Sequence, residues 1–285
     1  MLNVLTIDVE DWFCVEAFRD QFPTDTWELQ KTRILSNMVR VAELLDDYNV
    51  KATFFVLGWI AEKFPQVVEY LLSRGHEIGS HSYSHNLIYN MTPDEFKADT
   101  YRSLEVIKGK RDFPIIGYRA PSFSIRPEDK WVWEILAECG FKYDSSVFPV
   151  AHDIYGSPGA PRFAHEIVIS KGRTILEIPP STIRIFGNNV GFGGGGYLRL
   201  FPCWFTSWAI RRINKQGFPA IIYFHPWEID SNQPRQKGPL KSRLRHYTNL
   251  KTTETKLIKI LSKFRFGTMA EVFKLQENKK AGNNS

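Results

Sequence analysis

The sequence predicts an α/β protein in which strands alternate with helices to form a closed or nearly closed barrel. The first half of the chain switches repeatedly between buried-strand and amphipathic-helix patterns, which is typical of βαβ units and a parallel sheet. Six or more such repeats fit into 285 residues. Polar clusters follow the strands, and barrels collect reactive groups at the carboxyl ends of their strands. A doubly wound open sheet would gather polar groups in the same way, so the clusters indicate a site more than they define the sheet.

Hydrophobic periodicity places the elements of the first half in order along the chain. Strands are expected at 3–8, 51–57, 76–82, 115–121 and 141–146. Helices are expected at 32–48, 66–74, 92–108 and 130–140. The Thr-x-x-Glu capping box at 92–95 marks the start of the third helix, and Gly75 and Gly140 are expected to end the second and the fourth.

Beyond residue 150 the pattern loosens. Further strands are expected at 166–170, 174–185 and 220–224, and helices at 203–217 and 254–264. The glycine-rich stretch 191–200 lacks a nucleotide-binding motif, so its glycines are expected to permit tight turns or a close backbone approach near the site. We divide the chain into a barrel (1–230), a C-terminal extension packed on it (231–275) and a disordered tail (276–285).

Composition excludes several classes of protein. With 43% hydrophobic and 14% aromatic residues the chain can bury a sizeable core, and a net charge of +6 does not by itself indicate nucleic-acid binding. A solvated basic face is favoured over a contact with an anionic polymer or a membrane surface. Three scattered cysteines, Cys14, Cys139 and Cys203, are expected to be reduced core residues. No signal peptide or membrane span is recognisable, so a cytoplasmic protein is expected.

A metal site is predicted from "HSYSH" at 81–85 and "TIDVEDWF" at 6–13. His81 and His85, four residues apart, can meet one ion from the same face of a helical turn. Burying Asp8, Glu10 and Asp11 at the end of a strand is expensive without a cation or a basic partner. Two histidines and one carboxylate form the ligand set of a catalytic zinc site. One carboxylate is expected to ligate and another to act as general base, with the choice among Asp8, Glu10 and Asp11 open.

Three further polar residues lie at strand ends, and each has an ordinary alternative reading. Arg119 would keep a facing carboxylate ionised, although surface arginines are as common. Asp144 is as readily a turn former as a site residue. His225 ends a very apolar strand and, beside a metal, would suit a general acid, whereas alone it would as readily be a core histidine.

Five ordered segments, "TIDVEDWF", "HSYSH", "YRAPSFS", "YDSSVFP" and "YFHPWEID", resemble the motifs of the NodB-homology polysaccharide deacetylases, carbohydrate esterase family 4. The resemblance covers roughly residues 1–230. "SRLRHYTNL" and "FRFGTMAEVF" further resemble the C-terminal extension of the exosortase-associated branch, which is linked to exopolysaccharide production. The family implies a distorted (β/α)7 barrel, a divalent metal such as zinc, and hydrolysis of N-acetyl groups on hexosamines.

The resemblance also implies roles for individual residues. It makes His81 and His85 metal ligands and Asp8 the catalytic base paired with Arg119. His225 becomes the general acid and Asp144 the residue that tunes it. "DVED" departs from the usual pair of adjacent aspartates and slightly favours Glu10 over Asp11 as the ligand. "RAPSF" departs from the usual third motif. Substrate contacts are expected at Ser122, Phe123 and Trp227, and an oxyanion-binding N–H near Ser122 or Phe123.

The resemblance thus implies a metal-dependent N-acetylhexosamine deacetylase that releases acetate from a polysaccharide or its precursor. Zn²⁺ is the expected cofactor, and Co²⁺ or Ni²⁺ would suit the same ligands. The expected partner is an N-acetylated saccharide and not nucleic acid, with peripheral contact to the inner membrane as an additional expectation. Two alternatives stay open: an allantoinase-like or other small-molecule amidase, and a non-catalytic carbohydrate-binding protein of the same fold.

Overall fold

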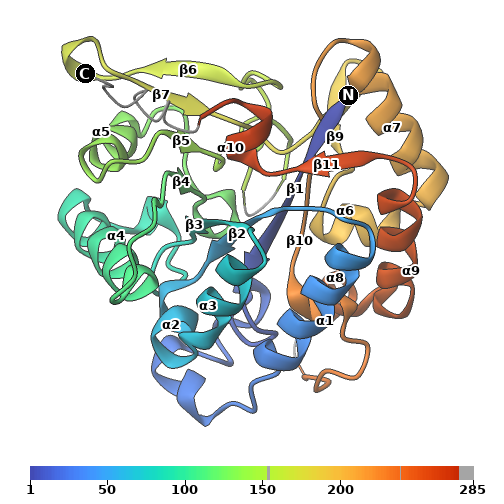
Figure 1. Ribbon diagram of the computed structural model, residues 1–285, viewed down its shortest axis with the longest axis horizontal. Coiled ribbons are helices and arrows are strands. Elements are labelled where there is room, and N and C mark those ends of the chain that lie inside the picture. The colour runs from blue at the N-terminus through green and yellow to red at the C-terminus, as the bar shows by residue number, and fades with distance from the viewer. Residues whose placement is uncertain (153–154, 238, 276–285) are drawn as a thin grey trace, which may run out of the picture.

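The computed structural model describes residues 1–152, 155–237 and 239–275, and within them helices surround one large sheet (Figure 1). The strands pair in the order β10-β1-β2-β3-β4-β5-β7-β6, and β11 pairs with β1. All pairs are parallel except β6 with β7. The strands of this sheet are β1 (Leu2–Val9), β2 (Thr53–Val56), β3 (Glu77–Ser80), β4 (Gly117–Tyr118), β5 (Tyr143–Asp144), β6 (His165–Val168), β7 (Thr174–Glu177), β10 (Ile221–Phe224) and β11 (Arg265–Gly267).

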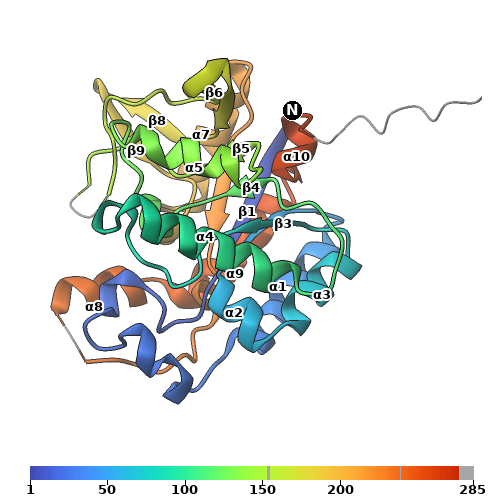
Figure 2. The same cartoon turned by 90° about the vertical axis from the view of Figure 1, so that its left-hand side faces the viewer.

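The helices lie outside the sheet (Figure 2), and the four that the sequence predicts in the first half are all present. The short α2, between β2 and α3, was not predicted. The capping box of α4 forms as expected, with the Thr92 side chain accepting from the Glu95 N–H. The helices are α1 (Ile34–Asp47), α2 (Gly58–Lys63), α3 (Gln66–Ser73), α4 (Pro93–Lys108), α5 (Lys130–Glu138), α6 (Gly195–Leu200), α7 (Cys203–Lys215), α8 (Leu240–Tyr247), α9 (Leu250–Leu261) and α10 (Met269–Val272).

The predicted barrel is confirmed, and it is distorted between β7 and β10. The strand expected at 174–185 is two strands, β7 and β8 (Thr182–Ile185), because Pro179 and Pro180 cannot donate ladder hydrogen bonds. β8 forms a separate two-stranded sheet with β9 (Asn188–Gly191). The gap to β10 is spanned by loop contacts: the Ile221 N–H donates to Ser181 Oγ over 2.7 Å. A single bridge joins Gly194 to Tyr223.

The strand β1 organises the sheet. Residues 3–9 of this strand are buried and rich in β-branched side chains, as expected for a strand covered on both faces. β1 pairs with β10 and β2 over its C-terminal half and with β11 near its N-terminus. Residues 8–11 therefore emerge at the carboxyl edge of the sheet, beside the ends of β2 and β10.

The C-terminal part of the chain shares the core of the barrel. Leu257, Ile260 and Phe266 belong to the same hydrophobic cluster as β1 and β2. The helix expected at 254–264 is α9, which starts earlier and ends earlier than predicted. The core is thus continuous across the division that the sequence suggested at residue 230. The predicted disordered tail, 276–285, lies outside the described residues.

The glycine-rich stretch allows the close approach that the sequence analysis expected. A Cβ added to Gly194 would lie 2.0 Å from the Tyr223 ring, which is buried on β10. The φ of Gly194 is −174°, so the requirement is for space and not for an unusual backbone angle. Because the backbone lies directly on this ring, α6 starts next to the end of β10.

We expect Gly194→Ala to lower the free energy of unfolding by about 1–3 kcal/mol, because a methyl group would be forced against a rigid buried ring. Gly196→Ala is the matched control, since a Cβ there meets nothing within 4 Å. Urea denaturation of both variants checks this. Equal losses of stability would show that the contact with Tyr223 is not the reason for the glycine.

Candidate active site

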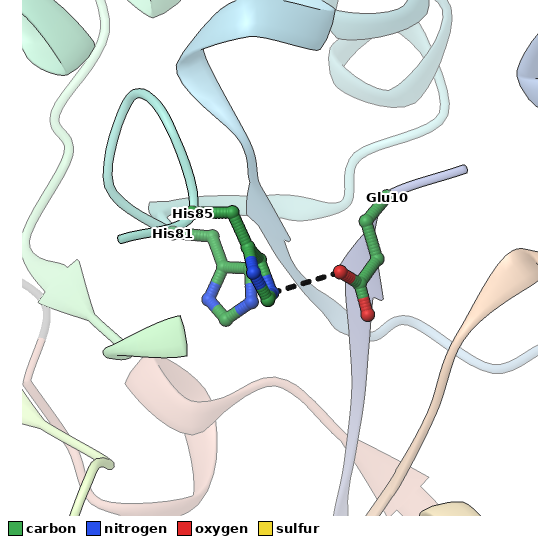
Figure 3. A group of neighbouring side chains, drawn as sticks. All are labelled: Glu10, His81 and His85. Carbon is green, nitrogen blue, oxygen red and sulfur yellow. Dashed lines mark ion pairs between the residues drawn. The ribbon is translucent and has the colours of Figure 1, made fainter. Parts of the chain in front are cut away.

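Glu10, His81 and His85 converge at the carboxyl edge of the sheet (Figure 3). Glu10 follows β1, and the two histidines follow β3. One potential ligand atom from each lies within 4.8 Å of the others, and all three side chains are 2–3% exposed. His85 Nε2 is 2.9 Å from Glu10 Oε2. The structure therefore brings together the two histidines and one of the two carboxylates that the sequence left open.

The two histidines meet through a turn and not through the helical turn that their spacing suggested. Residues 81–85 have no helical structure, and Ser82 and His85 adopt left-handed backbone angles, with φ of 62° and 57°. The Nδ1–H of His81 donates to the Arg119 carbonyl over 2.8 Å, which leaves Nε2 of that ring as a ligand atom. Such a bond fixes the tautomer and orientation of a metal-binding imidazole.

The residues present fit a divalent cation. Glu10 Oε2 is buried and accepts no hydrogen bond from the described residues, although His85 Nε2 is close. Burial alone would raise the pKa of Glu10, but the neighbouring imidazoles of His85 and His225 outweigh it and lower the pKa to about 2. Burial lowers the pKa of His81 to about 4, so that ring is neutral at pH 7. A buried carboxylate and neutral imidazole nitrogen are ligands that zinc prefers.

Asp11 does not belong to this group, which corrects the alternative in which it binds the metal. Its Oδ2 accepts from the Thr32 hydroxyl at 2.7 Å and from the backbone N–H groups of Arg33 and Ile34 at 2.7 and 3.1 Å. These are donors at the start of α1, where a carboxylate is favourable. Side chains alternate along an extended chain, so Asp11 points away from the face that carries Glu10.

Asp8 pairs with Arg119 at the floor of the site. Arg119 Nη1 is 2.7 Å from Asp8 Oδ1, and both side chains are almost fully buried. The guanidinium also donates to Thr6 Oγ1 at 2.8 Å and to Ser145 Oγ at 2.9 Å. The structure thus brings together Asp8 and Arg119, which the sequence predicted to be neighbours. The second carboxylate oxygen of Asp8 lies 3.8 Å from His225 Nε2.

His225, at the end of β10, faces the same group. Its Nε2 is 3.1 Å from Glu10 Oε1, and its Nδ1–H donates to Glu228 Oε1 over 2.6 Å. Burial would lower the pKa of His225, but the carboxylates of Glu10, Glu228 and Asp8 outweigh it and raise the pKa to about 9. The imidazole is therefore oriented by one carboxylate and directed toward two others.

Asp144 does not contact His225, which corrects the role that the family resemblance gave it. Its carboxylate accepts from Trp133 Nε1 at 3.0 Å and from the Ser145 N–H at 2.8 Å. It also hydrogen-bonds the Ser146 hydroxyl, which accepts from the Ala120 N–H at 2.7 Å. Asp144 therefore shapes the loop after β4, and Glu228 occupies the position next to the histidine.

Sequence reasoning missed Glu228 and Arg199, which form a buried ion pair behind His225. Arg199 Nε is 2.6 Å from Glu228 Oε2, and the two side chains are 4% and 0% exposed. Arg199 Nη1 also donates to the His246 carbonyl at 2.5 Å. Glu228 had a local signal, because it lies three residues after His225 as in a capping box, and that box forms. Arg199 had no sequence signal beyond its position after the glycine-rich stretch.

One pocket of about 300 Å³ is lined by eight of the eleven predicted site residues, the exceptions being Asp11, Arg119 and Asp144. Ser122 and Phe123 lie on its wall with left-handed φ angles of 51°. The Phe123 N–H already donates to the Ala120 carbonyl, so the Ser122 N–H is the better candidate for binding an oxyanion. Trp227 is 5% exposed and stacks on His225 and His246.

His246 is a wall residue from the C-terminal part of the chain that the sequence did not predict. Its ring lies 4.2 Å from that of Trp227 at an interplanar angle of 13°, and its Nε2–H donates to Gln233 Oε1 over 2.6 Å. Burial and the nearby Arg199 lower the pKa of His246 to about 3. A neutral, hydrogen-bonded imidazole thus backs the aromatic wall of the pocket.

Comparison with known proteins finds a family match for the first half of the chain. A polysaccharide deacetylase family model matches residues 28–143, and a domain of unknown function (DUF3473) matches residues 145–274. A solved structure from Mycobacterium smegmatis, described as a polysaccharide deacetylase, has a TM-score of 0.61 at 19% identity and covers 99% of this chain and 93% of its own. This likeness shows the fold. The prediction of a polysaccharide deacetylase domain is confirmed for residues 28–143, whereas the exosortase-associated branch stays a prediction.

Two curated relatives match shorter stretches. A peptidoglycan-N-acetylglucosamine deacetylase of Bacillus cereus is 40% identical over 88 residues, which are 31% of this chain and 30% of that protein. A peptidoglycan deacetylase of Helicobacter pylori is 32% identical over 108 residues, 38% of this chain and 36% of that protein. The chain thus spans about a third of the length of these relatives.

The buried carboxyls of Asp144 and Glu177 generate a prediction about pH and stability. Burial raises the pKa of Asp144 to about 6, and burial and the charge of Asp144 raise the pKa of Glu177 well above its usual value. The unfolded chain releases these protons near pH 4–5 and the folded chain holds them. Stability is therefore present at low pH and is lost as the pH rises toward the folded-state values, by up to about 1.4 kcal/mol per pH unit for each proton.

We expect Glu177→Gln to reduce this loss, because the amide keeps the acceptor for the Val147 N–H without an ionisable group. Urea denaturation between pH 5 and 8 should show the variant gaining stability relative to the wild type as the pH rises. Glu166→Gln, at an exposed position of the neighbouring β6, is the control. Parallel pH profiles of Glu177→Gln and wild type would show that the raised pKa of Glu177 is not the cause of the loss of stability.

Proposed function

Because the chain carries a domain of the polysaccharide deacetylase family, we propose that it is a metal-dependent deacetylase of N-acetylhexosamine units in a saccharide polymer or its precursor. The observation that carries the proposal is the convergence of Glu10, His81 and His85 with Asp8 and His225 in one pocket. The names of the curated relatives, both peptidoglycan deacetylases, support an N-acetylated saccharide as the substrate.

Glu10, His81 and His85 are the residues that would hold the cation, and zinc suits a ligand set of two imidazoles and one carboxylate. Cobalt or nickel would suit the same atoms. When bound, the cation supplies Lewis-acid chemistry, which polarises an amide carbonyl and makes water more acidic.

Asp8 is proposed as the general base and His225 as the general acid. Asp8 accepts the proton of water as the water oxygen bonds to the carbonyl carbon, and Arg119 balances the carboxylate charge in the dry interior. The Ser122 N–H is placed on the pocket wall to bind the developing oxyanion. His225 Nε2 then gives a proton to the departing nitrogen, so that the C–N bond breaks and acetate and a free amine are formed.

Glu228 and Arg199 are proposed to position His225. Glu228 accepts from both the Nδ1–H and the backbone N–H of His225, at 2.6 and 3.0 Å. These bonds fix the ring with Nε2 toward the pocket, as the carboxylate does in a catalytic triad. Arg199 balances the charge of Glu228, which has no exposure to solvent. The carboxylate of Asp144 accepts from Trp133 Nε1 and from the Ser145 N–H instead.

Two other functions use the same fold. A small-molecule amidase would not need the ligand set, so the convergence of all three ligands argues against it. A non-catalytic carbohydrate-binding protein would not need the Asp8–Arg119 pair and the His225–Glu228 pair beside the ligands. Both pairs are intact, so catalysis is the better supported proposal.

We expect Glu10→Gln, His81→Ala and His85→Ala to lose the bound metal, because each removes one of three ligands. Asp11→Asn is the matched control next to Glu10. It should keep the metal and lose about 1–2 kcal/mol of stability, since Asp11 satisfies donors at the start of α1. Metal analysis and urea denaturation measure both quantities. Loss of metal in Asp11→Asn with retention in Glu10→Gln would reverse the ligand assignment.

We expect the zinc-loaded protein to release acetate from N-acetylglucosamine oligomers and His225→Ala to keep its metal while kcat falls by about 10²–10⁴-fold. Glu228→Gln should also lower kcat, whereas Asp144→Asn should stay near wild type once corrected for folded protein. Acetate assays with metal analysis check all three. Hydrolysis of small amides alone would favour the amidase, and sugar binding without turnover of any acetylated saccharide would favour the binding protein.

A further inference from the structure

The outer face of α7 carries large apolar side chains in an unusual position. Trp204 is 69% exposed and Trp208 40% exposed, and they lie one turn apart on the same face. The opposite face packs into the core through Ala209, Ile210 and Ile213. Two exposed tryptophans on one helix face cost hydrophobic free energy in water, and such faces mark interaction sites.

The same face becomes cationic toward the end of α7. Arg211, Arg212 and Lys215 are exposed, and none of the three is paired with a carboxylate in the part of the chain that the structure describes. The Arg212 guanidinium lies 5.7 Å from the Trp208 ring centre. The sequence contains no aspartate or glutamate between Glu177 and Glu228. An uninterrupted stretch without acidic residues favours an anionic partner for this face.

The face is continuous with the pocket. Leu200, at the end of α6, is 61% exposed and lines the pocket. Ring contacts then lead outward from the pocket wall, with centroid distances of 6.5 Å from Tyr197 to Phe201, 4.5 Å from Phe201 to Phe205, and 5.5 Å from Phe205 to Trp208. An apolar strip therefore joins the pocket mouth to the exposed face of α7.

We propose that the α7 face, defined by Trp204, Trp208, Arg211, Arg212 and Lys215, docks the protein on an anionic lipid surface. Tryptophan side chains prefer the membrane interface, and neighbouring arginines and lysines are attracted to anionic headgroups. No helix among the described residues is long and apolar enough to span a bilayer. Docking by this face would bring the pocket mouth to saccharides held at the bilayer surface, a consequence that rests on the proposed function.

The test is co-sedimentation of the full chain with vesicles of phosphatidylglycerol and phosphatidylcholine in equal parts, against vesicles of phosphatidylcholine alone. We expect binding to the anionic vesicles that weakens in 0.5 M salt (about 4 Å screening length). Trp204→Ser/Trp208→Ser should weaken binding about tenfold or more. Arg211→Gln/Arg212→Gln/Lys215→Gln should weaken it about a hundredfold. Leu29→Ser/Tyr101→Ser, at positions before α1 and on α4 that are 82% and 48% exposed, is the matched control and should bind like wild type.

Several results would overturn the proposal. These are absence of binding to anionic vesicles, equal binding by the α7 variants and the control, or a dimer in light scattering that the tryptophan variants convert to monomer. The last result would make the face an interface with a second copy. Acetate release from soluble oligomers without vesicles should be unchanged in the α7 variants. Vesicle binding without any acetate release would refute the proposed function alone, and acetate release without vesicle binding would refute only the docking.

Discussion

The structure depends on how the negative charge at the tip of β1 is compensated. Asp8 and Glu10 are 2% and 3% exposed, and ionised carboxylates at such depth cost several kcal/mol each unless they are paired. Asp8 is paired with Arg119, which crosses the interior from β4. Glu10 is surrounded by imidazoles and retains one oxygen without a hydrogen bond. The cation that we propose would supply what Glu10 lacks, so the same electrostatic requirement that shapes the fold would also define the site.

Much of this arrangement could be predicted because parallel strands end at one edge. The residues that follow β1, β3, β4 and β10 are far apart in sequence. Parallel pairing of these strands brings them close together in space. The histidine spacing was informative although its local structure was misjudged: two left-handed residues in a turn replace the helix. Ordered motifs can identify a constellation without fixing the backbone that presents it.

What could not be predicted is which carboxylate serves which partner. Asp11 lies one residue from Glu10, and only the position of α1 shows that it is taken by backbone donors. Asp144 and Glu228 are both acidic and both near strand ends, but Asp144 bonds to Trp133 and to the Ser145 N–H, whereas Glu228 bonds to His225. The residue nearer in sequence is the one that orients the imidazole, because Glu228 closes a turn on His225 itself.

Arg199 has a wider consequence. Its guanidinium is held by the carbonyls of His246 and Thr248, at 2.5 and 3.3 Å, while its other side meets Glu228. The orientation of His225, which follows β10, thus relies on main-chain oxygens contributed by α8 and by the residue after it. Replacing the residues after 230 with those of a distant relative would therefore disturb the position of His225 even if both parts folded, because the support of Arg199 comes from that segment.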